Sequence, residues 1–141
     1  MARAKMGKEI SIRLGNVRGT GAQLFGKLKE AGVNVVASCC YQIGDEATFT
    51  IVPDDIDRAS ALLVDEAETR TQDVLLLELP NEPGALAKVL VEISMLGVDV
   101  RSAYATSGGT KKSALAVLKT EDDERVLEAL ADGGDEDEDA N

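Results

Sequence analysis

Apolar and polar residues alternate along the segment from Glu9 to Leu14. A period of two residues is the pattern of a β-strand with one buried face. The period then changes, because apolar residues recur every three or four positions from about Thr20 to Ala31, which predicts an amphipathic helix. Gly32 follows at once, where a helix C-cap favours a residue with positive φ. A strand and a helix that share one core are therefore expected here.

The residues that follow predict two more strands and a second helix. Strands are expected from Val33 and from about Ala47 to Val52, and turn residues at 43–46 indicate a hairpin between them. The second helix begins near Asp55, where an acidic residue suits the positive end of the helix dipole. The predicted order is β-α-β-β-α.

The same order appears again when the sequence is shifted by 65 residues. The shift, taken without a gap, superimposes Leu14-Gly15-Asn16-Val17-Arg18-Gly19 on Leu79-Pro80-Asn81-Glu82-Pro83-Gly84, Gly32 on Gly97, Gly44 on Gly109, Val52 on Val117, Asp57 on Asp122 and Leu62 on Leu127. The glycine and asparagine matches fall at predicted junctions, so the chain is expected to contain two copies of one module. The second copy's helices are expected at about 85–96 and from about residue 121.

The expected fold class is α+β, with two ferredoxin-like modules of the βαββαβ type, each an antiparallel sheet with its helices on one face. The segment Thr69–Leu79 must serve as the last strand of the first module and then as the first strand of the second. From Asp132 onward the chain is acidic and glycine-rich, so the second module lacks a last strand and one sheet edge is expected to be open. Open edges invite pairing with another chain, which predicts a homodimer or tighter coupling between the modules.

Four segments are expected. They are a solvated N-terminal leader at 1–7, a first module at 8–68, a second module at 69–131 and an acidic, disordered tail at 132–141. Six of the last ten residues are acidic, and such a run repels itself. The tail either solvates the protein or binds a basic partner.

Composition narrows the classes of function. The net charge is -11, and aromatic residues make up 3% of the chain with no Trp, which argues against a nucleic-acid partner. The apolar runs are too short for a membrane span and the N-terminus lacks a signal-peptide core, so a cytoplasmic protein without membrane contact is expected.

Candidate catalytic chemistry is scarce. The absence of histidine excludes Ser-His and Cys-His nucleophile systems and the commonest zinc ligand sets. Cys39 and Cys40 are adjacent, lack the spacing of a redox or zinc pair, and are expected to be buried and inert. The run from Gly108 to Lys112 lacks P-loop spacing and is expected to be a hairpin tip, and Asp54-Asp55 are expected to cap a helix. No catalytic residue, metal site or cofactor is expected, and the chain is not expected to be an enzyme.

The junction Asn81-Glu82-Pro83-Gly84 is the strongest candidate for binding. A helix N-terminus leaves backbone N–H groups without partners, and these suit a carboxylate. Pro83 stiffens the loop, Gly84 allows close approach to the backbone, and an asparagine side chain both donates and accepts. Asp99, after the helix, has the charge to pair with an ammonium group. The alternative is that the asparagine is only a helix cap and Pro-Gly only a turn.

The segment "LPNEPGALAKVLVEISMLGVDV" resembles the first half of an ACT domain, a small-molecule regulatory module of amino-acid biosynthetic enzymes. The segment "LGNVRGTGAQLFGKLKEAGVNV" is similar to it, with Arg18 where the family has proline. The resemblance covers nearly all of residues 8–131 and extends to the tandem ACT regulatory region of aspartate kinases.

The resemblance implies a binding mode in which an amino acid lies between the loop of one module and the strand start of its neighbour. The residues it implies in the second copy are Asn81, Glu82, Pro83, Gly84, Ala85, Leu86, Val98, Asp99 and Val100. In the first copy they are Asn16, Val17, Arg18, Gly19, Thr20, Gly21, Asn34 and Val35. Arg18 either binds an acidic group of the ligand or lies in solvent.

Two functions stay open at this point. One is a module that senses a free amino acid and transmits occupancy to a partner enzyme or regulator. The other is a ligand-free dimerisation adaptor that acts in transcriptional or metabolic regulation through protein contacts.

Overall fold

The computed structural model describes residues 3–66, 68–107 and 112–139, with side chains described as far as Ala131. The elements are β1 (Arg3–Gly15), α1 (Thr20–Glu30), β2 (Val35–Ile43), β3 (Glu46–Pro53), α2 (Ile56–Leu63), β4 (Glu68–Pro80), α3 (Ala85–Met95), β5 (Val100–Ser107), β6 (Ser113–Thr120) and α4 (Asp123–Asp139). This order is the predicted β-α-β-β-α, twice. The paired strands are antiparallel, and their order is β2-β3-β1-β4-β6-β5.

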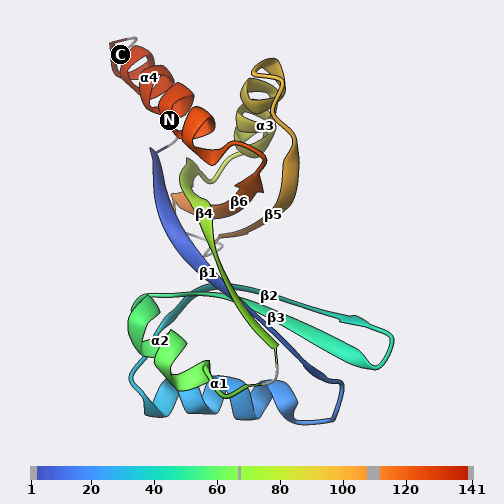
Figure 1. The fold of residues 1–141 in the computed structure, drawn as a ribbon. Coiled ribbons are helices and arrows are strands. Elements are labelled where there is room, and N and C mark those ends of the chain that lie inside the picture. The colour runs from blue at the N-terminus through green and yellow to red at the C-terminus, as the bar shows by residue number, and fades with distance from the viewer. Residues whose placement is uncertain (1–2, 67, 108–111, 140–141) are drawn as a thin grey trace. The chain divides into compact units, whose positions relative to one another are not determined.

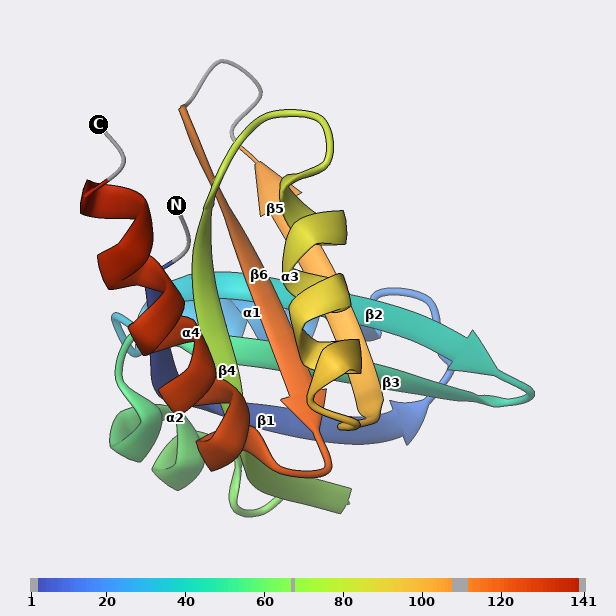
Figure 2. The same ribbon diagram turned by 90° about the horizontal axis from the view of Figure 1, so that it is seen from above.

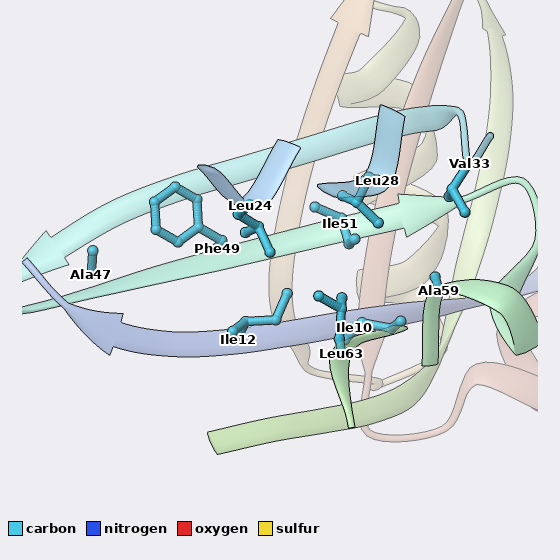
Figure 3. Packing of buried hydrophobic residues seen from close by; sticks show 10 residues of the cluster. All are labelled: Ile10, Ile12, Leu24, Leu28, Val33, Ala47, Phe49, Ile51, Ala59 and Leu63. Carbon is cyan, nitrogen blue, oxygen red and sulfur yellow. The ribbon is translucent and has the colours of Figure 1, made fainter. Parts of the chain in front are cut away.

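The chain forms two units, and the first is made of residues 8–72. Its strand order is β2-β3-β1-β4, with the start of β4 as the last strand, and α1 and α2 lie on the same face (Figure 1). Ile10 pairs with Ile51 and Ile12 with Phe49, so these side chains point toward the helices. Figure 3 shows the resulting core: Ile10, Ile12, Leu24, Leu28, Val33, Ala47, Phe49, Ile51, Ala59 and Leu63.

The second unit contains residues from Asp73 onward together with the start of β1. Its strand order is β1-β4-β6-β5, and Figure 2 shows α3 and α4 on the same side of β4, β6 and β5. Its core consists of Leu75, Leu77, Leu79, Val89, Ile93, Val98, Ala116, Leu118, Val126 and Leu130. Each unit thus has the βαββαβ layout, which confirms the α+β fold of two ferredoxin-like modules.

The start of the chain differs from the prediction of a solvated leader. Residues 3–7 belong to β1, and Ala4 packs against the core of the second unit. This segment occupies the position of the missing last strand, so the open edge expected there is covered. The sequence pattern did not reveal it because one short strand with a single half-buried side chain has too little periodicity. The first unit also extends to Gln72 rather than to residue 68, because β4 begins in that unit and ends in the other.

The repeat is offset by 65 residues only as far as the hairpins. Ile12 pairs with Phe49, and its counterpart Leu77 pairs with Ala116, so the later residues are 67 apart. The second hairpin is two residues longer, and its tip, with Gly108 and Gly109, lies outside the described residues. The gapless matches of Val52 with Val117, Asp57 with Asp122 and Leu62 with Leu127 are therefore wrong. In their place Leu63 corresponds to Leu130, and both are buried in their cores.

Two further expectations differ from the structure. Helix α4 continues to Asp139, so it includes most of the segment expected to be a disordered acidic tail. Cys40 is exposed and Cys39 half-buried, rather than both buried. Their strand β2 ends the strand order, so it has a neighbour on one side only.

Candidate functional site

The loop between β4 and α3 is fixed by its backbone. The Asn81 amide donates to the Lys112 carbonyl at 2.8 Å, which ties the loop to the β5–β6 hairpin. The Glu82 amide donates to the Pro80 carbonyl at 3.0 Å, and the Ala85 amide to the Glu82 carbonyl at 3.3 Å. These bonds form a tight turn that leads directly into the helix.

The loop between β1 and α1 has the same construction. The Asn16 amide donates to the Asp45 carbonyl at 2.7 Å, the Val17 amide to the Gly15 carbonyl at 2.9 Å, and the Thr20 amide to the Val17 carbonyl at 3.1 Å. The Thr20 hydroxyl also donates to the Val17 carbonyl, at 2.7 Å. Arg18, which replaces the family's proline, therefore leaves the backbone of this loop unchanged.

Each helix begins after a glycine in the left-handed conformation. Gly19 has φ 89° and ψ -4°, and Gly84 has φ 86° and ψ -7°. A Cβ on either glycine would meet no atom within 4 Å, so the positive φ, and not crowding, explains the glycine. The space beside the Cα of each of these two glycines is open.

Neither of these helices has a side-chain cap at its N-terminus. Asn16 and Asn81 lie three residues before the glycine N-caps, so the interpretation of the asparagines as helix caps is wrong. The Thr20 and Ala85 amides donate to the loop carbonyls described above, whereas the next amides of α1 and α3, at residues 21–22 and 86–87, have no acceptor within their helices. Each loop thus presents amide donors at the positive end of a helix dipole, an arrangement that suits a carboxylate.

Gly21 and Leu86, both predicted to contact ligand, have packing roles. A Cβ on Gly21 would lie 3.1 Å from Cε1 of Phe49, so the glycine makes room for the ring. Leu86 is half-buried against the second core, where Ala116 takes the place of Phe49. The first copy thus has the small residue on the helix and the large one on the strand, and the second copy has the large residue on the helix and the small one on the strand.

The predicted strand starts divide into core and exposed residues. Val98 is buried, and Val35 and Val100 pack against the cores of their units. Asn34 and Asp99 are exposed, so they are the side chains of this group that face solvent.

The backbones at Asn34 and Asp99 are each held by an acidic residue, in a role that the sequence analysis missed. The Asn34 amide donates to Oδ1 of Asp54 at 3.0 Å, and the Asp54 amide donates to the Asn34 carbonyl at 2.9 Å. The Asp99 amide and Glu121 make the same reciprocal pair, with both distances 3.0 Å. The offset of 67 residues would have revealed this correspondence. Both strands also have an irregular register at the following residue, between Val35 and Ala37 and between Val100 and Ser102.

The loop and the strand start of one copy do not meet. They lie at opposite ends of α1 or α3, and a helix of 11 residues is about 16 Å long. A site that uses both must take the loop from one module and the strand start from another. That is the division of residues implied by the ACT resemblance.

Comparison with known proteins identifies the family. A family model described as "ACT domain pair" matches residues 6–133. The chain belongs to the ACT domain pair family. No curated protein matches this chain.

Solved structures share the fold of this ACT domain pair. Protein BT0572 from Bacteroides thetaiotaomicron is 28% identical, with 93% of this chain and 90% of that chain covered and a TM-score of 0.84. The ligand-free regulatory subunit of aspartate kinase from Thermus thermophilus is 15% identical, with 94% and 96% covered and a TM-score of 0.70. A structure of aspartokinase alpha and beta subunits is 16% identical, with 95% and 97% covered and a TM-score of 0.64.

The two loops of the ACT domain pair differ in charge, although their backbones agree. The first loop carries exposed Arg18, and the second carries exposed Glu82 at the corresponding turn. Exposed Asp99 adds a negative charge to the second strand start, where the first copy has neutral Asn34. Among the described residues, no group of three or more Cys, Asp or Glu side chains is arranged to hold a metal ion, and no helix is long and apolar enough to cross a membrane.

Proposed function

We propose that this ACT domain pair is a regulatory protein that binds a free amino acid and transmits its occupancy to a partner enzyme or regulator. The observation that carries the proposal is the shared construction of the two loops. Each has an uncapped helix N-terminus behind a left-handed glycine with open space above it. A zwitterion places its carboxylate on these amides, and its ammonium group needs acceptors from the second element of the site.

The strand start of another ACT module supplies those acceptors in this proposal. Exposed Asp99 contributes a carboxylate, and exposed Asn34 contributes an amide oxygen. The proposed activity is binding alone. The resemblance in fold to the aspartate kinase regulatory subunit supports a regulatory role.

The proposal is tested by thermal unfolding of the purified protein with each of the twenty amino acids at millimolar concentration. A ligand that binds only the folded state at 100 times its Kd stabilises that state by about 2.7 kcal/mol. We expect one amino acid, or one chemically related group, to raise Tm in a saturable manner. Asn81→Ala and Asn16→Ala, tested separately, identify the loop that binds, because each variant keeps its loop's backbone tether. If no amino acid shifts the Tm of a protein that unfolds cooperatively, the sensor proposal is wrong.

The adaptor function remains the second candidate because β2 is a suitable surface for pairing. It lies at one end of the strand order, carries no charged residue, and exposes Tyr41 and Ile43. Uncharged edge strands pair readily with other chains. A molar mass of two chains by light scattering, with no thermal shift from any amino acid, favours this function.

A further inference from the structure

The second unit obtains its last strand from the opposite end of the chain. Its own sequence, from Asp73 onward, provides β4, β5 and β6, and residues 3–7 of β1 lie beside β4 in the remaining position. In the first unit the same position is filled by the start of β4, which is tethered at both ends.

This N-terminal strand, residues 3–7, buries little side-chain surface. The Ala4 side chain packs against the core of the second unit, whereas the side chains of Arg3, Lys5 and Met6 are exposed. Further along β1, Ile10 and Ile12 are fully buried in the first unit. Segments that bury little apolar surface open more readily than the buried elements next to them.

The contacts nevertheless select a particular kind of segment. A Cβ on Gly7 would lie 2.5 Å from Cδ1 and 2.9 Å from Cγ of Leu76, so a side chain at this position fits beside β4 only if the Leu76 side chain shifts. Ala4 is small and faces the core. The segment carries the cations Arg3 and Lys5, and β4 carries Asp73 and Glu78 within a chain of net charge -11.

We propose that the edge of β4 in the second unit is a strand-acceptor site. The site binds an extended basic segment with small residues at two positions. In one chain the N-terminal strand occupies this site, and it exchanges with the N-terminal strand of a second copy. When the segment leaves, the N–H and C=O groups of β4 on that side lose their partners and become free to pair with an incoming strand. This role is independent of any amino-acid ligand.

The test uses full-length protein and a labelled peptide with the sequence of residues 3–8, acetylated and amidated. Gly7→Val places a branched side chain against Leu76, and Ala4→Asp places a charge against the core, so both variants displace the N-terminal strand in cis. Gly15→Val is the matched control, because it lies in the same strand and a Cβ there meets no atom within 4 Å. Binding is followed by fluorescence anisotropy, and hydrogen exchange reports the protection of β4 amides.

We expect the peptide to bind Gly7→Val and Ala4→Asp at least tenfold more tightly than wild type or Gly15→Val. In the latter two proteins the tethered segment competes at an effective concentration that reaches millimolar. Amides of β4 should lose protection in the two displaced variants and regain it with peptide. A peptide that itself carries both substitutions should not bind. Absence of saturable peptide binding to all four proteins, or equal binding of the substituted peptide, would overturn the proposal.

Discussion

The reversed pair of small and large residues between the two ACT copies leads to a quantitative prediction. In the first unit Gly21 on α1 faces the ring of Phe49 on β3, and in the second the corresponding residues are Leu86 and Ala116. If packing explains Gly21, then Gly21→Leu and Phe49→Ala should each destabilise the protein, and the double variant should recover much of the loss.

The expected magnitudes follow from burial. Phe49 is 8% exposed and its ring makes an edge-to-face contact with Phe25 at a centroid distance of 6.4 Å. Removal of such a ring costs about 3–5 kcal/mol. Leucine at position 21 overpacks the site at a cost of about 1–3 kcal/mol, and about 1 kcal/mol of this is offset because glycine is a poor helix former. Leucine fills much of the space that the ring leaves, so the two changes should couple by about 2 kcal/mol.

Urea unfolding of the four proteins in this cycle, followed by circular dichroism, measures the coupling. The double variant should lose clearly less unfolding free energy than the sum of the single variants. Additivity within about 0.5 kcal/mol would refute the packing explanation. Ligand contact would then be the explanation left for the glycine at position 21.

Two other predictions concern the second unit. Asp123→Ala removes the carboxylate that accepts from the Thr120 amide at 2.8 Å and from the Thr120 hydroxyl at 2.7 Å, and Thr120 is buried. The variant should therefore lose about 2–3 kcal/mol of unfolding free energy. Glu124→Ala, at an exposed position, is the near-neutral control, and an equal effect of both changes would contradict this account. Gly84→Ala should cost about 1–2 kcal/mol because alanine is strained in the left-handed conformation, as measured by chemical denaturation. Gly15→Ala should change stability by less than about 0.5 kcal/mol, and a Gly84→Ala protein as stable as that control would show that the loop relaxes.

Local sequence patterns predicted the elements well. Alternation at residues 9–14, helical periodicity after Gly19 and Gly84, and glycines at the helix ends were sufficient for the β-α-β-β-α order and its repetition. The loops were found for the same reason, since Gly19 and Gly84 occur where the backbone requires positive φ. These features depend on residues close together in the chain.

The assignment of residues to binding or packing could not be made in this way. Gly21 and Leu86 have identical positions in their helices, but only the facing strand reveals that one accommodates an aromatic ring and the other fills a core. The pairs of Asn34 with Asp54 and of Asp99 with Glu121 join residues about 20 positions apart across a hairpin. The two-residue difference between the hairpins hid this correspondence from a gapless comparison.

The sequence by itself determined the β-α-β-β-α module, its duplication and the glycine loops that precede α1 and α3, because backbone preference and periodicity are local properties. The tertiary structure alone decided that residues 3–7 are a strand of the second unit. One alanine and one glycine form no periodic pattern. Their role depends on contacts with residues more than sixty positions away, because Gly7 lies beside Leu76 and Ala4 packs against the core of the second unit. It also decided that the loop and strand start of one copy lie apart, since the helix between them separates its two ends by its own length.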